Sequence, residues 1–284
     1  MKIKLFTPLF LLLFLCGSLV QADPTYKKPY VLANSASSDE VKANLTAQGF
    51  EIAGEYEASD AKVIVVTSEA LKKAAAESEN GGYGATQRIA ITGEVVSYTN
   101  PVYWANGYQM ANDLTEVTTA LEKALGNKGE FGSKDGMTIK ALRGYHYTMM
   151  MPYFTDPIEL ATYPSYKEAV AAVDANLKAS KGGTKFVYRV DIPDKDETVF
   201  GMGILGDKEG ADNVVMKTLN EYTKGPKHTA YMPYELLVSG TKVYMLHGKF
   251  RIALSFPDLS MWQFMKIRNA PGGIEKAATE AVAQ

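Results

Sequence analysis

The chain has 284 residues, of which 46% are hydrophobic and 22% are charged, and its formal net charge is −2. This composition is that of a globular protein with enough apolar residues for one large core or two smaller ones. Acidic and basic residues nearly balance, and no Lys/Arg cluster suggests nucleic acid or anionic lipid as the expected partner.

Residues 1–22 have the pattern of a secretory signal peptide. A basic start precedes the apolar residues 5–19, and a small-residue cleavage site ends at Ala22. We expect cleavage after Ala22 and export to the periplasm or the exterior, with no integral membrane segment left after cleavage. Cleavage also removes Cys16, the single cysteine, so that disulfides, thiolate catalysis and Cys-ligated metal sites are excluded in the mature chain.

Residues 29–125 predict a first α+β unit. Apolar runs bounded by turn residues predict strands, and apolar residues at helical spacing after a serine cap predict helices. In chain order these elements are a strand at 29–34, a helix at 38–48, strands at 50–56 and 62–67, a helix at 68–78, a Gly-rich turn at 80–84, strands at 87–92 and 94–99, and a helix at 114–125.

A linker at 126–136, rich in Gly, Lys, Ser and Asp, leads to a second α+β unit at 137–284. The same signals predict the elements of this unit. They are a strand-rich segment at 137–154, a strand at 157–162, a helix at 166–179, strands at 185–192 and 199–205, a helix at 211–224, a three-stranded antiparallel meander at 231–256 and a final helix at 271–283.

The meander can be assigned a register from its turns. Two-residue loops at Ser239-Gly240 and at Gly248-Lys249 predict pairing of Leu236 with Val243 and of Val243 with Leu254. One face of the meander is then apolar and faces the core. The other face is mixed, and it is available to water, a partner or a second sheet.

The two units repeat one order of elements. Residues 29–34 match residues 157–162, and the string from Val95 to Trp104 echoes the string from Ile252 to Trp262. These matches favour a tandem duplication. The predicted fold is α+β, with two related units, each a mostly antiparallel sheet with helices on one face, arranged as a pseudo-dimer.

Several strings resemble one known family. They are Gln48-Gly-Phe after an amphipathic helix, Tyr231-Met-Pro, Lys242-Val-Tyr, and Phe250-Arg-Ile-Ala-Leu-Ser-Phe-Pro-Asp. These strings resemble the family catalogued as domain of unknown function three hundred and two, best over residues 160–284 and less well over 30–125. The resemblance implies a small α/β fold that often pairs, so that a homodimer is an expected assembly. It implies no activity and no catalytic motif.

Familiar catalytic motifs are missing from the sequence. There is no G-x-S-x-G elbow, no H-E-x-x-H and no P-loop. Gly201-Met-Gly-Ile-Leu-Gly206 matches the dinucleotide fingerprint by letter, but it lies within a predicted strand instead of between a strand and a helix. His228 follows Gly-Pro-Lys and is expected in a solvated turn. We therefore expect a non-catalytic small-molecule-binding or accessory protein, with an uncharacterised enzyme as an alternative.

A Tyr-rich cleft between the units is the first candidate site. Its residues are Tyr145, Tyr147, Tyr153, Tyr231, Tyr234 and Arg251. One interpretation is a cleft for an apolar small molecule, and the other is that these are ordinary strand and interface aromatics. Glu235 lies within reach of Arg251 across the meander, which favours sheet stabilisation over catalysis. A protein partner on the mixed sheet face is the alternative to a small molecule.

A copper site is the second candidate. Met232 and Met245 are expected to flank His247 on one sheet face, and Met149–Met151 lie near His146. Thioether sulfur and imidazole suit Cu(I), so that a Met/His copper-binding protein is an alternative function. The opposing interpretation is that these methionines fill an irregular core. The sequence requires no other cofactor.

Overall fold

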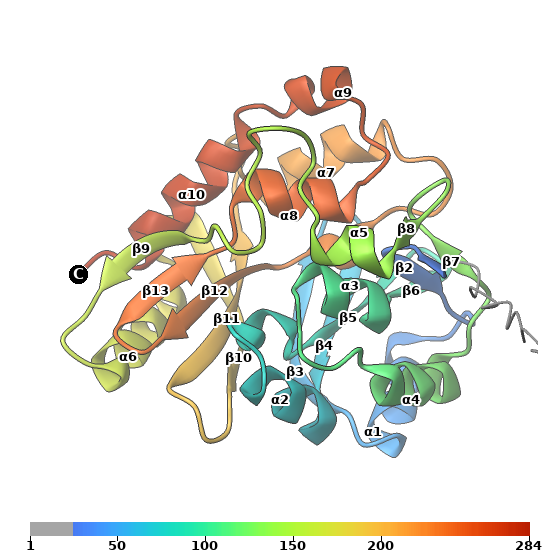
Figure 1. Cartoon of the computed structure of the whole chain (residues 1–284), viewed down its shortest axis with the longest axis horizontal. Helices are drawn as coiled ribbons and strands as arrows, with labels where there is room; N and C mark the ends of the chain where they lie inside the picture. Colours follow the sequence, from blue (N-terminus) through green and yellow to red (C-terminus); the bar gives the residue numbers. More distant parts are fainter. Residues whose placement is uncertain (1–24) are drawn as a thin grey trace, which may run out of the picture.

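The computed structural model describes residues 25–284, so that the predicted signal peptide and Cys16 lie outside the described residues. Antiparallel sheets with helices packed around them make up the chain, which confirms the predicted α+β class (Figure 1). The first sheet has the strand order β3 (Glu51–Ala58), β4 (Ala61–Thr67), β5 (Gln87–Thr92), β6 (Val95–Thr99), β2 (Tyr30–Leu32) and β7 (Glu130–Phe131). The second sheet has the order β10 (Thr184–Asp191), β11 (Glu197–Ile204), β12 (Tyr234–Ser239), β13 (Lys242–Met245) and β9 (Ile158–Thr162). A short ribbon pairs β1 (Tyr26–Lys27) with β8 (Met137–Thr138).

Serine and threonine caps start many of the helices. Ser37 and Glu40 form a capping box, and Ser68, Thr138, Ser165 and Ser260 each accept a hydrogen bond from a backbone N–H in the first turn. The α-helices are α1 (Ser38–Ala47), α2 (Glu69–Ala76), α3 (Pro101–Gly107), α4 (Thr115–Leu125), α5 (Ile139–Arg143), α6 (Tyr166–Lys178), α7 (Asp212–Asn220), α8 (Gly248–Ser255), α9 (Met261–Lys266) and α10 (Ala270–Ala281). Short 3-10 turns occur at η1 (Gly81–Gly84), η2 (Lys181–Gly183) and η3 (Thr229–Tyr231).

The two sheets share one connectivity. In each, the first strand of the unit (β2 or β9) lies beside the last (β6 or β13), and the other strands follow in chain order. The spacing agrees as well, because β12 and α8 begin 147 residues after β5 and α3. This is the arrangement that two related units would show. The predicted echo of Val95–Trp104 with Ile252–Trp262 was wrong in register, since β6 is matched by β13 and not by the helix that follows it.

The third strand of the predicted meander is a helix. His247 caps α8 through Nδ1, which accepts a hydrogen bond from the backbone N–H of Lys249 at 3.2 Å. All residues from Phe250 to Phe256 are buried, and a fully buried segment shows no periodicity that separates strand from helix. Leu236 pairs with Met245 instead of Val243, a two-residue shift that keeps the same residues on each sheet face.

Two other segments differ from expectation. The region 137–154 was predicted to be strand-rich, but beyond β8 it forms α5 and a loop. Part of the predicted linker 126–136 forms β7, which pairs with β2 at the edge of the first sheet. The glycine-rich string at 201–206 does lie largely in a strand, β11. A Cβ at Gly201 would stand 2.1 Å from the ring of Tyr188, so that close packing accounts for this glycine.

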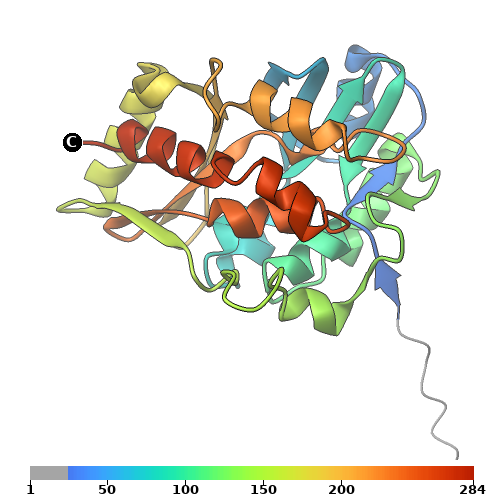
Figure 2. The ribbon, with the colours of Figure 1, turned by 90° about the horizontal axis from the view of Figure 1, so that it is seen from above.

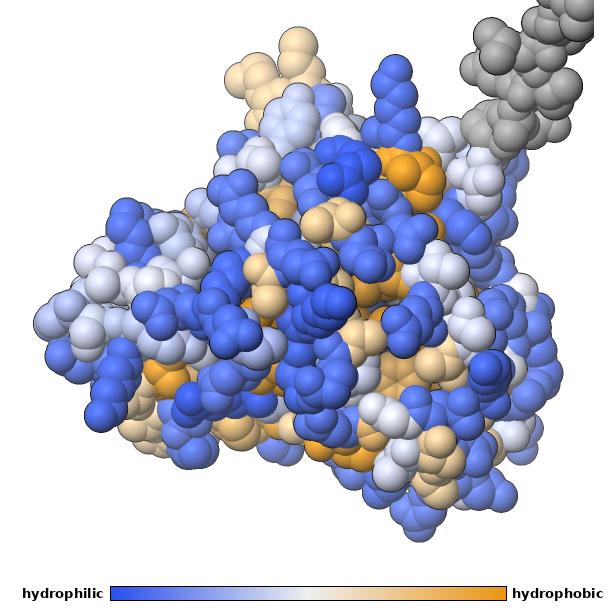
Figure 3. All heavy atoms as spheres, turned by 60° about the horizontal axis from the view of Figure 1, so that its bottom comes forward, coloured by the Kyte–Doolittle hydropathy of each residue, from blue (hydrophilic) through white to orange (hydrophobic). Residues whose placement is uncertain are grey.

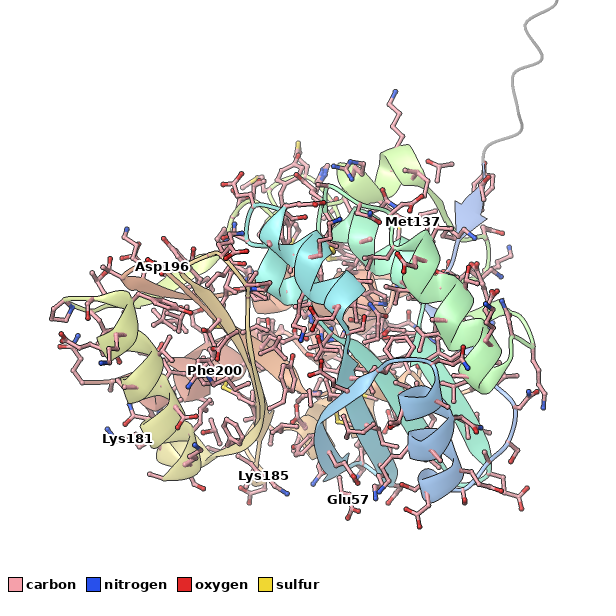
Figure 4. The ribbon with its side chains drawn as sticks, turned by 90° about the horizontal axis from the view of Figure 1, so that it is seen from below. Glu57, Met137, Lys181, Lys185, Asp196 and Phe200 are labelled. Atoms are coloured by element: carbon pink, nitrogen blue, oxygen red, sulfur yellow. The ribbon has the colours of Figure 1, made fainter. Side chains whose placement is uncertain are left out.

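The two units share one core, and their edge strands β3 and β10 lie against each other (Figure 4). Gly54 on β3 meets the backbone of Val187 on β10. Tyr56 on β3 donates a hydrogen bond of 2.7 Å to Asp212 in the first turn of α7. On the far side of the second sheet, α6 contacts β10 through β13. The junction is therefore a packed interior and not a flexible hinge.

A methyl group at position 54 is expected to force the two units apart. A Cβ there would lie 2.2 Å from the carbonyl oxygen of Val187, and backbone atoms cannot rotate away as a side chain can. Gly54→Ala should lower the free energy of unfolding by about 2 kcal/mol or more, measured by urea denaturation. Gly272→Ala is the matched control, because nothing lies within 4 Å of that position in α10 and alanine favours a helix. Equal effects of the two substitutions would contradict the close contact.

Candidate functional site

A buried ion cluster lies where the two sheets meet. Arg88 on β5 forms an ion pair through Nη1 with Oε1 of Glu235 on β12, and Nε of Arg251 on α8 lies 3.1 Å from Oε2 of Glu235. All three side chains are at most 3% exposed. Two guanidinium groups therefore share one carboxylate inside the protein. Such a cluster needs every partner, because an unpaired buried charge is costly.

Trp104 on α3 completes the cluster. Cζ of Arg88 lies 5.0 Å and Cζ of Arg251 lies 5.1 Å from its ring centroid. Arg88 and Glu235 are 147 residues apart, and so are Trp104 and Arg251, which is the spacing between matching elements of the two units. Matching positions of the two units thus face each other in pairs at the centre of the junction.

Three of the predicted ligand-binding residues belong to this packed centre. Arg251 also donates to the carbonyl oxygen of Tyr231 at 2.9 Å and to Oγ of Ser255 at 3.0 Å. Tyr234 donates to the carbonyl oxygen of Leu246 at 2.6 Å. Arg251, Tyr231 and Tyr234 are at most 1% exposed. The structure brings them together as interior, and it leaves no open surface on them for a ligand.

The other three tyrosines of the predicted cleft lie on the loop after α5. Tyr145 packs on Phe250, with ring centroids 6.2 Å apart, and Tyr147 stacks on Phe264 of α9 at 5.2 Å. Tyr153 is 41% exposed. The six residues therefore form two groups, one inside the junction and one on the loop after α5, where Tyr145 and Tyr147 are half-buried and Tyr153 is exposed.

The residues of the predicted copper site have structural partners. Met232 and Met245 are fully buried, and Nδ1 of His247 is occupied by the cap of α8. Among residues 25–284, no group of three or more His, Cys, Asp or Glu side chains is arranged to hold a metal ion. Thioether sulfurs are a different set of ligands, so that copper binding stays a prediction.

A cavity of about 800 Å³ lies beside the junction. It opens where the segment after β7 meets the loop before η3 and the segment after α8. Its lining has apolar and aromatic side chains together with polar and charged ones. The lining residues are Lys28, Glu130, Phe131, Gly132, Ser133, Lys134, Asp135, Tyr222, Thr223, Lys224, His228, Phe256, Asp258, Leu259 and Gln263. The volume lies in the range of small-molecule sites, roughly 300–1,000 Å³.

His228 is the most distinctive residue of this cavity. Its ring packs on three aromatic rings, with centroid distances of 4.9 Å to Tyr30, 5.8 Å to Phe131 and 4.8 Å to Phe256. It is only 5% exposed, so that the expectation of a solvated turn was wrong. The chain turns inward here because Thr229, Ala230 and Tyr231 form the buried turn η3. The aromatic rings hold the imidazole in one orientation.

The chemistry of His228 is that of a fixed hydrogen-bond acceptor. Burial lowers its pKa to about 4, so that the ring is neutral at pH 7. Nδ1 lies 3.1 Å from the carbonyl oxygen of Ser255, which only accepts, and Nδ1 therefore carries the proton. Nε2 then holds a lone pair, and it makes no hydrogen bond to any residue in 25–284. A ligand that donates an N–H or O–H group can meet it.

A loop of the first unit forms one wall of the cavity. Gly132 has φ +98°, and a Cβ there would lie 2.8 Å from the ring of Tyr30 and 3.3 Å from Cε1 of His228. Only glycine allows the loop to pass this close to the two rings. Asp258 holds the same loop, since it accepts from Oγ of Ser133 at 3.0 Å and from the backbone N–H of Lys134 at 2.7 Å.

The rim of the cavity carries three lysines and three acidic residues, and several of them fix its walls. Glu130 accepts from the backbone N–H of Lys28 at 2.8 Å and from Nζ of Lys27 at 3.1 Å. Nζ of Lys28 donates to the carbonyl oxygen of Lys134 at 3.0 Å. Because the rim carries both signs and uses them to fix the loop, the cavity does not select a strongly charged ligand.

A second hollow, of about 720 Å³, differs in character. It lies between the β3–β4 hairpin and α7 and has no aromatic side chain in its lining. Glu57 marks the end of this hairpin in Figure 4. Figure 3 turns the lower side of the molecule forward and shows a surface dominated by hydrophilic residues, with apolar ones between them.

Comparisons with family models, with curated proteins and with solved structures found no match to this chain. The site is therefore interpreted from its own geometry. No helix within residues 25–284 is long and apolar enough to cross a membrane.

Residues that define the cavity were not singled out by the sequence. Phe131 and Gly132 lie in the predicted linker, and Phe256 was assigned to the last strand of the meander. One signal was present, because the linker has a single aromatic residue among polar ones. An isolated aromatic in such a segment has to pack on a surface formed elsewhere in the chain.

Proposed function

We propose that the protein binds a small, largely apolar and flat molecule with one hydrogen-bond donor in the His228 cavity. A single observation carries this proposal. A buried, neutral histidine offers an unpartnered ring nitrogen in a cavity of about 800 Å³ that has aromatic side chains in its lining. Stacking on Phe131 or Phe256 would supply affinity, and the acceptor Nε2 would supply orientation.

The chemistry of the cavity supports binding more than catalysis. A histidine with a pKa of about 4 is a weak general base at pH 7, because its conjugate acid is too strong. The serine in the lining, Ser133, donates its hydroxyl proton to Asp258 and is not paired with a base such as histidine. With the predicted signal peptide, the proposed role is that of an exported binding or accessory protein.

The test begins with the purified protein that starts at Asp23. Native mass spectrometry is expected to show a co-purifying organic molecule, or binding of aromatic alcohols, amides or indoles from a fragment library. His228→Phe keeps a stacking ring but removes Nε2, and it should weaken binding about tenfold or more, since the donor of the ligand is left unpaired.

Two further variants separate the cavity from the rest of the surface. Thr223→Trp adds a ring to the lining of the His228 cavity and should abolish binding. Lys217→Trp adds the same bulk to the hollow beside the β3–β4 hairpin and should leave binding unchanged. Ligands that bind both tryptophan variants equally, or that respond to Lys217→Trp alone, would contradict the proposal.

A further inference from the structure

Large apolar side chains are exposed on two neighbouring segments of the second unit. On the loop after α5 they are Met149, Met150 and Tyr153, and on α9 they are Met261, Trp262 and Met265. Met150 is 94% and Trp262 is 71% exposed. Only three other large apolar side chains among residues 25–284 are similarly exposed, and they are Tyr26, Val95 and Leu205. We call the six residues of the two segments the Met/Trp surface.

Specific contacts hold the two segments together. The ring of Tyr147 stacks on Phe264 at 5.2 Å, and its hydroxyl donates to the carbonyl oxygen of Leu259 at 2.6 Å. Figure 1 shows the loop after α5 passing α8 toward α9 at the top of the molecule, and in Figure 2, which is seen from above, α9 faces the viewer. The loop and the segment at α9, more than 100 residues apart in the chain, therefore lie side by side.

Three large apolar side chains of α9 are exposed. Met261 and Met265 are four residues apart and lie on one side of the helix, with Trp262 next to them. Phe264 points the other way and is buried. The Ser260–Gln263 capping box fixes the start of the helix, so that the methionines and Trp262 are held outward.

The charge on these segments has one sign. Residues 137–152 and 260–269 contain Lys140, Arg143, Lys266 and Arg268 and no Asp or Glu, although the chain as a whole has a net charge of −2. The guanidinium group of Arg143 donates to the carbonyl oxygens of Met110 and Gln109 after α3, so that the charge argument rests on Lys140, Lys266 and Arg268. Nζ of Lys266 lies 4.7 Å from the centroid of the Trp262 ring. The nearest acidic residues along the chain are Asp135, Asp156 and Asp258, of which Asp156 and Asp258 each accept a hydrogen bond from a backbone N–H. Glu209 also contacts the second segment, since it accepts a hydrogen bond of 2.6 Å from the side chain of Asn269.

The sequence suggested no anionic lipid as partner, because the basic residues of the two segments are far apart in the chain. We propose that the Met/Trp surface nevertheless docks the protein on an anionic phospholipid membrane. A bilayer offers both features that this surface needs, an apolar layer for Trp262 and the methionines and phosphate groups for the lysine and arginine side chains. Tryptophan is enriched at the membrane–water boundary, and exposed apolar residues with basic neighbours are typical of proteins that lie on a membrane. The proposal does not depend on the His228 cavity.

Tryptophan fluorescence can measure this interaction. It has two tryptophans, of which Trp104 is buried at 3% exposure and Trp262 is exposed. With protein that starts at Asp23, so that the apolar leader cannot bind lipid itself, vesicles of phosphatidylglycerol and phosphatidylethanolamine should shift the Trp262 emission to shorter wavelengths. Vesicles of phosphatidylcholine alone should give a much smaller shift, and raised salt should weaken the binding.

Two variants test the proposal, and the amount of protein that floats with the vesicles measures binding. Trp262→Ala with Met265→Ser should weaken binding about tenfold or more, because a buried apolar side chain contributes about one such factor. Leu205→Ser, an exposed apolar residue outside the surface, should change nothing. Absence of vesicle binding, or binding that survives Trp262→Ala with Met265→Ser, would overturn the proposal. Self-association lost in that variant without any lipid binding would assign the surface to a second copy instead.

Discussion

Glu235→Gln is expected to lower the free energy of unfolding by about 3–5 kcal/mol, the largest effect of any single substitution considered for this chain. Glutamine keeps the shape of the side chain but removes the charge that Arg88 and Arg251 share. Both guanidinium groups then stay buried without a counter-charge. Urea denaturation followed by circular dichroism measures the loss.

An exposed ion pair provides the control for this prediction. Glu159 and Lys242 lie 2.6 Å apart on the surface, and Glu159→Gln should leave the denaturation midpoint almost unchanged. Adding Arg88→Met to Glu235→Gln should restore part of the stability, because it removes one of the two unpaired cations. If Glu235→Gln were as mild as Glu159→Gln, the junction would not depend on the ion cluster.

His228 is expected to make the fold sensitive to acid. Its pKa is about 4 in the folded protein and about 6.5 in the unfolded chain, so that the unfolded chain binds one more proton between these values. Stability contributed by the neutral ring is complete above pH 6.5 and falls as the pH drops toward 4. The loss relative to a His228→Phe variant should reach about 3 kcal/mol. Urea unfolding at a series of pH values measures it.

The contribution of His228 is the difference in stability between the unsubstituted protein and His228→Phe at each pH. This difference is needed because Asp212 changes the stability with pH in the opposite direction. Burial raises the pKa of Asp212 to about 6, although the backbone N–H of Ile204 and the hydroxyl of Tyr56 favour the charged form. Its proton binding therefore adds stability as the pH falls from 6 to 4. Asp212→Asn should remove this compensation and steepen the acid loss. A pH profile that is the same with and without His228 would contradict its burial as a neutral ring.

Elements with a local signal could be predicted from the sequence. The strands at Gln87–Thr92 and Ala61–Thr67 and the helix after Ser165 follow from apolar patterns and caps of a few residues. The helix α8 could not be predicted, because every residue of Phe250–Phe256 is buried. A fully buried string has no pattern that separates a strand from a helix. His247 caps this helix, and histidine is not among the residues preferred as helix caps. The Gly248-Lys249 step also has the sequence of a hairpin turn.

The candidate site depends on contacts that no local pattern encodes. Phe131 and His228 meet across almost 100 residues, through a loop whose course is set by Gly132 and Asp258. The Arg88–Glu235 pair was within reach of sequence reasoning, because its members are 147 residues apart, the spacing between similar elements of the two predicted units. A repeat was predicted, but the echo was placed in another register, so that the pair was not predicted.

The ring nitrogens of the histidines give the most direct test of the proposed binding site. The chain has three histidines, His146, His228 and His247, so that their ¹⁵N signals can be assigned by substitution. We predict that His228 is protonated on Nδ1 and stays neutral down to about pH 4, and that a bound ligand shifts its Nε2 signal while the other two rings do not respond. A ring that titrates near pH 6.5, or ligands that bind without moving the His228 signal, would show that the cavity is not the binding site.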